Sequence, residues 1–516
     1  MGFLEERDLE GVCTIPEYFR GKTIFITGGS GFMGKVLLEK LLYSCSDLER
    51  VYLLLRDKKG VKAEERLKQL YASRCFDRLR RERAGLFEQK VFYIGGDVTQ
   101  LGLGMSEEDR TLLVNRTHII YHVAACVRFD DPLKEAVKLN LRGTREIVEL
   151  AKDVMNLEAL VHVSTSYANT NRAQIDEVVY PPFADWRQTL DICDRLDDDT
   201  LNVLTAKYLG ELPNTYVFTK QLAEHVVYEQ RGQLPVVIVR PSIVISSIEE
   251  PAPGWVENLN GPVGMLVASG KGILRSMYTH PDLVSDYIPV DSAIQAFVAA
   301  AWIRGTKKLE PSDDVEVYNC STSHMKTMTM GEIIECGKQL IQEVPLEGGL
   351  WFPGGGLTTS RTVFFINVIF LHLLPAVLVD ILLRLLGQKP MLVKLQRRIF
   401  SANLALQYYI TQAWIFLNHN LLQLRSRIKE EDRAAFYYDL ENFDQKEYFR
   451  NAIMGGKVYI LQEKMEDLPK AKAHITRMKI VDRVVKVIFY GLVLWVVYRL
   501  DFTQNLINYL TYNFIL

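Results

Sequence analysis

Tyr216 and Lys220 lie four residues apart in the segment PNTYVFTK, and this spacing suits proton transfer to a carbonyl oxygen. On a helix, residues four apart share one face, so the phenol and the ammonium group would lie side by side. A nearby ammonium group lowers the phenol pKa from about 10, which lets a tyrosine donate and regain a proton near neutral pH. The spacing is common by chance, so the pair indicates catalysis only if other segments supply the rest of a site.

Two hydroxyl residues follow the apolar run that ends near residue 163, upstream of the Tyr/Lys pair. The strands of a doubly wound sheet end at the crevice where such sheets bind ligands, so a hydroxyl there can reach a substrate carbonyl oxygen. We assign this role to Thr165, with Ser164 as the alternative. Taken alone, either residue is explained as well by a satisfied hydroxyl at a strand end.

A glycine-rich loop follows the first apolar run, Thr23 to Thr27, and a helical stretch follows the loop. In this arrangement Gly28 permits a tight turn, Gly31 lets the backbone approach a pyrophosphate, and Gly34 allows close packing of helix on strand. The helix N-terminus then faces the anion. The pattern predicts dinucleotide binding, and its TGxxGxxG spacing is that of extended short-chain dehydrogenases. The glycine loop, the two hydroxyl residues and the Tyr/Lys pair occur in this order along the chain. Together they predict an active site.

The residue after the second apolar run predicts which dinucleotide binds. An NAD enzyme usually places an acid there to hold the ribose hydroxyl, whereas this chain has Arg56, with Lys58 and Lys59 close behind. A guanidinium group can make a paired contact with a 2′-phosphate, so we expect NADPH. The alternative is a solvated basic turn, and the acid Asp57 beside Arg56 weighs toward it.

Two more strand ends supply candidate cofactor contacts. Asp97 and Val98 follow the third run, where they are placed to meet adenine, although Asp97 would serve equally as a strand-end cap. Ala124 and Ala125 close the fourth run, where small side chains let the backbone approach the cofactor. We predict that the cofactor-binding residues are Thr27, Gly28, Ser30, Gly31, Phe32, Met33, Gly34, Arg56, Asp97, Val98, Ala124, Ala125, Tyr216, Lys220, Pro241, Ser242, Ile243 and Val244.

The chain from Lys22 to about Asn319 alternates short apolar runs with longer amphipathic stretches, which predicts an α/β fold on a doubly wound parallel sheet. The apolar runs are Thr23 to Thr27, Val51 to Leu55, Val91 to Ile94, Ile119 to Ala124, Ala159 to Ser164 and Val236 to Val239. We divide the chain into a lead-in (1–20), an NADP-binding Rossmann reductase domain (21–345), a linker (346–362), a mainly helical, membrane-associated C-terminal domain (363–480) and a membrane-anchor segment (481–516).

Composition narrows the class of protein. A length of 516 residues favours two or three domains, and 24% charged residues with a net charge of -2 make nucleic acid an unexpected partner. The 7 cysteines form no CxxC pair, which indicates reduced thiols in a cytosol-like compartment. No histidine pair has metal-ligand spacing such as HExxH, so we predict no metal, and we expect His122 and His162 to be packed core residues.

Two apolar stretches indicate a membrane. Val363 to Val379 carries no charge but contains Pro375, so we interpret it as a helix that lines an acyl pocket or lies against a bilayer rather than as a span. Val487 to Tyr498 follows a basic stretch, which favours a membrane anchor flanked by the cytosol, with a buried helix as the alternative. The acidic N-terminus and the Phe-Ile-Leu C-terminus resemble no import signal, so the peroxisomal and endoplasmic reticulum membranes both stay open.

The chain resembles the fatty acyl-CoA reductases that make long-chain alcohols, and the resemblance covers nearly its whole length. The segments that carry it are TGGSGFMGKVLLEKLL, CFDRLR, HVAACVRFD, HVSTSYANTN, IDEVVYPP, PNTYVFTK, VIVRPSIV, EPAPGWVENLNGPVGMLVASGKGILR and IPVD. The resemblance implies that two NADPH in turn reduce an acyl-CoA to an aldehyde and then to an alcohol, with loss of CoA between the steps. It makes Tyr216 the proton donor, Lys220 the group that tunes it and binds the nicotinamide ribose, and Thr165 the carbonyl partner.

Three alternatives stay open. A reductase that stops at the aldehyde, or a dehydrogenase of sterols or other hydroxy-lipids, would use the same scaffold. A protein that binds the dinucleotide without turnover is a third, although it would have no need of Tyr216 and its neighbouring amine.

Overall fold

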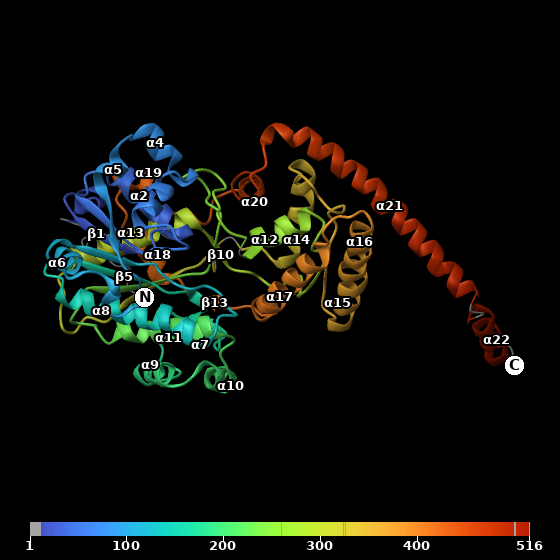
Figure 1. Ribbon diagram of the computed structural model, residues 1–516, viewed down its shortest axis with the longest axis horizontal. Helices are drawn as coiled ribbons and strands as arrows, with labels where there is room; N and C mark the ends of the chain where they lie inside the picture. Colours follow the sequence, from blue (N-terminus) through green and yellow to red (C-terminus); the bar gives the residue numbers. More distant parts are fainter. Residues whose placement is uncertain (1–11, 260, 324, 326, 500–501, 515–516) are drawn as a thin grey trace.

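The computed structural model describes residues 12–259, 261–323, 325, 327–499 and 502–514 of the chain, and a parallel sheet forms the middle of the lobe on the left of Figure 1. Within the described residues, seven strands lie in the order β11-β7-β5-β4-β1-β2-β3, and all neighbouring strands are parallel. The order reverses beside β1, as in a doubly wound sheet, so the predicted fold class is confirmed. The strands are β1 (Thr23–Thr27), β2 (Arg50–Leu55), β3 (Val91–Gly95), β4 (Ile119–His122), β5 (Ala159–Val163), β7 (Val236–Pro241) and β11 (Glu316–Cys320).

All six predicted apolar runs form strands of this sheet. The fourth ends at His122 rather than at Ala124, because the chain there leaves the sheet and passes close to the turn at Gly28. The strand β11 was not among the predicted runs, since Glu316 and Asn319 interrupt its apolar pattern. All residues of β11 after Glu316 are buried, so the burial of this strand depends on tertiary packing rather than on an apolar sequence pattern.

Helices cover both faces of the sheet, because successive strand residues point to opposite sides. In β1, Ile24 and Ile26 pack into one hydrophobic cluster and Phe25 into the other. The first cluster includes residues of α1 (Ile15–Phe19), α2 (Phe32–Ser44), α3 (Ala63–Tyr71), α4 (Asp77–Glu82), α5 (Leu86–Lys90), α13 (Val290–Thr306), α18 (His419–Ser426) and α19 (Glu430–Phe436). The second includes residues of α6 (Glu107–Arg116), α7 (Leu133–Ala136), α8 (Gly143–Asp153), α9 (Trp186–Arg195), α10 (Asp198–Leu209) and α11 (Thr215–Tyr228).

A third cluster forms a separate, mainly helical lobe. The chain after residue 360 is also mainly helical, which confirms the predicted helical C-terminal region. The elements of the lobe come from both halves of the chain, and short parallel strand pairs connect them. They are α12 (Gly261–Gly270), α14 (Met330–Glu343), α20 (Gln445–Gly455), β8 (Ile243–Ile245) with β10 (Tyr287–Pro289), and β9 (Ser276–Tyr278) with β12 (Gly356–Thr358). Beside this lobe lie α15 (Arg361–Asn367), α16 (Leu374–Leu385) and α17 (Leu392–Ile410) (Figure 1).

After α17 the chain returns to the sheet. Strand β13 (Ile415–Phe416) pairs with β6 (Gln174–Ile175), and α18 then packs against α13 and β11. The C-terminal part of the chain therefore contributes to the core of the first lobe, and the end of α17 lies beside the carboxyl edge of the sheet.

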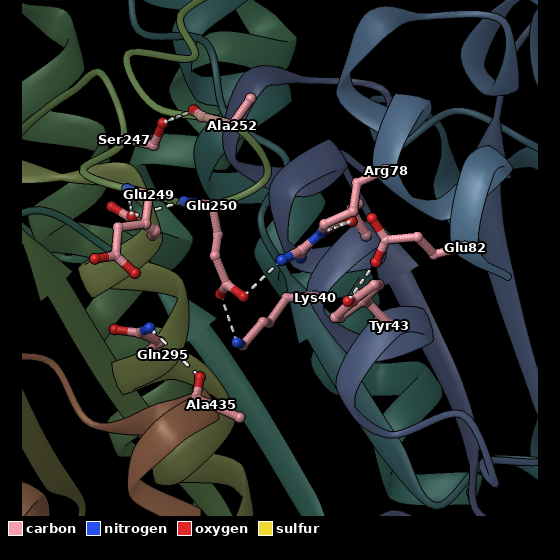
Figure 2. Close-up of polar contacts among 12 residues, drawn as sticks. Lys40, Tyr43, Arg78, Glu82, Ser247, Glu249, Glu250, Ala252, Gln295 and Ala435 are labelled. Carbon is pink, nitrogen blue, oxygen red and sulfur yellow. Dashed lines mark hydrogen bonds and ion pairs between the residues drawn. The ribbon is translucent and has the colours of Figure 1, made fainter. Parts of the chain in front are cut away.

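A buried ion network joins the start of the cofactor domain to the loop before α12 (Figure 2). Arg78 of the CFDRLR segment pairs with Glu39 of α2 at 2.7 Å and with Glu250 at 2.8 Å, and Lys40 reaches the same Glu250 at 2.5 Å. The carboxylate of Asp291 accepts hydrogen bonds from three backbone N–H groups of residues 248–250. Because Glu39 is fully buried, its charge is stable only beside the Arg78 guanidinium group, and the network fixes the loop against α2.

Among the described residues, one helical stretch, Arg361–Leu385, is long and apolar enough to cross a membrane. It has 25 residues, and its most apolar 18-residue window has a mean hydropathy of 2.3 and is only 17% buried. The helix α21 (Leu468–Arg499) runs away from the body as a long arm with α22 (Phe502–Phe514) at its end (Figure 1). Near the root of the arm, the buried carboxylate of Asp482 accepts a hydrogen bond from Trp351 at 2.6 Å. Residues 1–11 of the predicted lead-in, and 500, 501, 515 and 516 of the predicted anchor, lie outside the described residues.

Candidate active site

The predicted site residues gather at the carboxyl edge of the sheet, on both sides of the point where the strand order reverses. Because all seven strands are parallel, the segments that follow them emerge at the same edge. In spatial order these segments carry Asp97 and Val98 after β3, Arg56 after β2, the loop 28–34 after β1, Ala124 and Ala125 after β4, Ser164 and Thr165 after β5, and Ser242 to Val244 after β7.

The glycine loop is shaped as the three glycine roles require. Gly28 has a φ of +74°, and a Cβ on it would lie 2.6 Å from the backbone nitrogen of Ala124. A Cβ on Gly34 would lie 2.2 Å from the Gly28 carbonyl oxygen, so only glycine lets α2 begin this close to β1. Gly31 is the N-cap of α2 and offers no side-chain cap, so a phosphate group can meet the helix N-terminus.

Buried polar atoms beneath the loop and at the ends of β5 and β7 also fit a bound ligand. Thr27 lies beneath the loop, where its Oγ1 contacts Nδ1 of His122 at 2.7 Å and accepts a bond from the nitrogen of Ala124. The hydroxyl groups of Ser164 and Ser242 are buried and have no hydrogen-bond partner among the described residues. Buried hydroxyls without a partner are uncommon, and a ligand in the crevice would satisfy them.

Two arginines meet at the ribose end of the loop. Arg56 donates to Asp97 at 2.8 Å, while Arg66 of α3 donates to the backbone carbonyl of Arg56 and to Oγ of Ser30, the latter at 3.3 Å. Burial lowers the pKa of Arg66, and the positive charge of Arg56 lowers it further. An anion bound beside Ser30 would stabilise both guanidinium charges.

The acids beside these arginines are already engaged. Asp57 accepts a hydrogen bond from the backbone of Ala63 at 2.9 Å and pairs with Lys62 at 2.8 Å, so it caps α3. Asp97 accepts two bonds from Thr99 in addition to the bond from Arg56. The strand-end cap proposed as the alternative for Asp97 is therefore present, and Val98 packs against Gly143.

The helix α11 carries Tyr216 and Lys220, and its N-cap is Asn214, whose Oδ1 accepts a hydrogen bond from the backbone of Val217 at 3.0 Å. One turn along, the ammonium group of Lys220 donates to the Val163 carbonyl at the end of β5, at 2.8 Å. A hydrogen bond between the side chains of Thr165 and Tyr216 lowers the pKa of the phenol. The predicted trio of Thr165, Tyr216 and Lys220 therefore meets at one place.

The pKa of Tyr216 moves in the direction opposite to our expectation. Burial raises it to about 12, and the hydrogen bond with Thr165 only partly opposes the rise. Burial also lowers the pKa of Lys220 to about 8, and the nearby Glu224 carboxylate only partly opposes this shift. The phenol therefore stays protonated across the physiological range, and Lys220 is the member of the pair that titrates near neutrality.

Several residues of the site escaped the sequence reasoning. Arg66 sits in the helix after the second strand, and no spacing rule connects it with Ser30. Tyr409 comes from α17 and accepts a hydrogen bond from Nδ2 of Asn214 at 2.7 Å. Only the Asn214 position carried a local signal, since an asparagine before a helical stretch is a common N-cap. Among the described residues, no group of three or more His, Cys, Asp or Glu side chains can hold a metal ion.

The fold and site define a Rossmann-type oxidoreductase that binds NAD(P). Family models described as male sterility protein match residues 26–297 and 371–463. The chain is 40% identical to fatty acyl-CoA reductase 1 of Mus musculus over 468 residues, which cover 91% of this chain and 90% of that protein. It is 37% identical to fatty acyl-CoA reductase 2 of Bos taurus over 469 residues, 90% of each chain.

The chain belongs to the fatty acyl-CoA reductase family, so the resemblance seen in the sequence is confirmed. A solved structure, the terminal R domain from the myxalamid PKS-NRPS biosynthetic pathway, superposes with a TM-score of 0.58. The match covers 90% of this chain and 97% of that one at 19% identity, and it supports the fold alone.

The titration of Lys220 predicts an alkaline limit on activity. As pH rises through about 8, Lys220 loses its charge, so we expect kcat/KM for acyl-CoA reduction to fall above that pH. In Lys220→Arg the charge persists to much higher pH, so the limit should move upward even though the maximal rate is lower. The measurement is kcat/KM from pH 6 to 10 for both proteins. An alkaline limit that stays in place in Lys220→Arg would assign it to another group.

Proposed function

We propose that this protein reduces long-chain fatty acyl-CoA to primary fatty alcohol with two NADPH and releases CoA. The observation that carries the proposal is the meeting of Thr165, Tyr216 and Lys220 beside the glycine loop, in a chain of this family. Overall, one thioester takes up two hydrides and two protons and yields one alcohol and one free thiol, so an aldehyde lies between the two halves.

The chain's own groups would handle the carbonyl oxygen and its proton. The Thr165 hydroxyl would donate to the carbonyl oxygen and hold it beside Tyr216. Tyr216 would deliver its phenolic proton to that oxygen as negative charge develops. Lys220, held at the Val163 carbonyl, would place a positive charge next to the phenolate that remains. A reduced nicotinamide in the crevice would supply the hydride.

The basic end of the loop supports NADPH over NADH. A 2′-phosphate placed beside Ser30 would meet the guanidinium groups of Arg56 and Arg66 together, while Asp57 is occupied at the N-terminus of α3. Charge-assisted contacts of this kind discriminate strongly, because NADH would bring no anion to Arg66, which forms no ion pair with a carboxylate among the described residues.

This subsite is tested by Arg66→Ala. Loss of one charge-assisted contact of roughly 1.5–3 kcal/mol should raise KM for NADPH by about 10- to 100-fold and leave KM for NADH nearly unchanged. Lys58→Ala is the matched control, since Lys58 lies on the same basic turn and would keep the NADPH preference. Equal KM changes for the two cofactors in Arg66→Ala would contradict the assignment.

We also propose that the protein is attached to a membrane with its reductase domain in the cytosol, at the peroxisome or the endoplasmic reticulum. The exposed apolar side chains of Arg361–Leu385 and the exposed arm after Lys486 support this, with Val487 at 73% and Tyr498 at 76% exposure. A long acyl chain partitions into the same bilayer, because each methylene group gains about 0.8 kcal/mol of free energy when it leaves water.

The direct test is turnover of palmitoyl-CoA by membranes that contain the protein, with extracted lipids analysed for alcohol and aldehyde. We expect fatty alcohol at two NADPH per CoA released, and a loss of activity of about 10²–10⁴-fold in Tyr216→Phe, which lacks the proton donor. Aldehyde alone would favour a two-electron reductase, and no turnover across several chain lengths would favour the non-catalytic alternative.

A further inference from the structure

The end of α17 brings aromatic side chains to the catalytic tyrosine. The ring of Phe129 lies 5.8 Å from the ring of Tyr216 and 4.9 Å from that of Tyr409, measured between centroids. Tyr409 in turn lies 5.5 Å from Tyr167 and 6.1 Å from Trp414. We call Phe129, Tyr167, Tyr409 and Trp414 the aromatic wall.

The wall is built from two distant parts of the chain. Phe129 follows β4 and Tyr167 follows β5, whereas Tyr409 and Trp414 belong to the C-terminal part. The two halves are joined at the Thr170 carbonyl, which accepts hydrogen bonds from Trp414 and from Tyr408, each at 3.0 Å. The pairing of β13 with β6 secures the same junction, so the wall is a fixed part of the folded site.

Tyr409 also supports the catalytic helix. Its phenolic oxygen accepts the Asn214 amide at 2.7 Å, and the same Asn214 caps the backbone of α11 just before Tyr216. The other end of α17 is tied to the apolar helix, because Asp380 of α16 accepts the backbone N–H groups of residues 391–393 at 2.9–3.0 Å. A single helix therefore connects the stretch Arg361–Leu385 to the reaction site.

We propose that the aromatic wall closes the acyl side of the crevice and retains the aldehyde between the two hydride transfers, with Tyr409 as its decisive residue. The proposal rests on the function proposed above. When the thiolate of CoA leaves with a proton, the substrate loses its large polar group, and the aldehyde that remains is uncharged and apolar. Retention then depends on contact with apolar surface and on exclusion of water, which aromatic rings supply.

The position of the wall allows the cofactor to change while the aldehyde stays. The glycine loop and the two arginines lie at the ends of β1 and β2, whereas the wall lies beyond β4 and β5 on the other side of the switch point. On this proposal the phosphate-bearing end of the cofactor enters and leaves on the side of the switch point away from the wall.

The test compares Tyr409→Ala, Tyr409→Phe and the control Tyr93→Ala, a tyrosine on β3 that is 41% exposed and outside the site. The measurement is NADPH consumed per CoA released from palmitoyl-CoA, together with free aldehyde. We expect two NADPH per CoA for the wild type, Tyr409→Phe and Tyr93→Ala. For Tyr409→Ala we expect a ratio that falls toward one and at least a tenfold rise in free aldehyde.

The proposal would be overturned if the Tyr409→Ala protein consumed two NADPH per CoA released and produced no free aldehyde. If Tyr409→Ala does not fold, Phe129→Leu opens the wall from the other lobe and should release aldehyde in the same way. Lack of CoA release by the wild type would contradict the proposed function instead, so the two failures are distinguishable.

Discussion

The close approach of the Gly28 turn to the backbone of Ala124 is the constraint on which the rest of the site depends. At this point the strand order reverses, and two segments that leave neighbouring strands need to pass without side chains between them. A positive φ at Gly28 and the missing Cβ at Gly34 let α2 start directly above β1. The helix N-terminus, the arginine pair and the Thr165 hydroxyl then all lie at one edge of the sheet, because parallel strands end at the same edge.

The C-terminal part of the chain completes this crevice from the opposite side. It returns through β13, α18 and α19 to the core of the first lobe, and α17 ends beside the catalytic helix. The ion network around Arg78 and Glu250 holds the loop that contains Glu250 to α2 in a comparable way. The helical stretch Arg361–Leu385 is therefore connected through α17 to the helix that carries Tyr216.

The sequence predicted those features that depend on neighbours in the chain. The strand and loop pattern around Thr27 to Gly34 and the spacing of Tyr216 and Lys220 are local, so the six apolar runs and the catalytic trio could be placed. Contacts between distant segments could not be predicted. Arg66 reaches Ser30 only after α3 folds back, and Tyr409 reaches Asn214 only after the C-terminal part returns. The rise in the Tyr216 pKa has the same origin, since it reflects burial rather than the residue four positions away.

The central claim is that one crevice, with one tyrosine and one bound orientation of the cofactor, carries out both reductions. The most direct measurement uses NADPH that carries deuterium on either the 4R or the 4S position of the nicotinamide, with mass spectrometry of the alcohol. We expect one of the two labelled cofactors to place two deuterium atoms on C1 of the alcohol and the other to place none. One deuterium atom from each would contradict the central claim, because the two hydrides would then come from opposite faces of the nicotinamide.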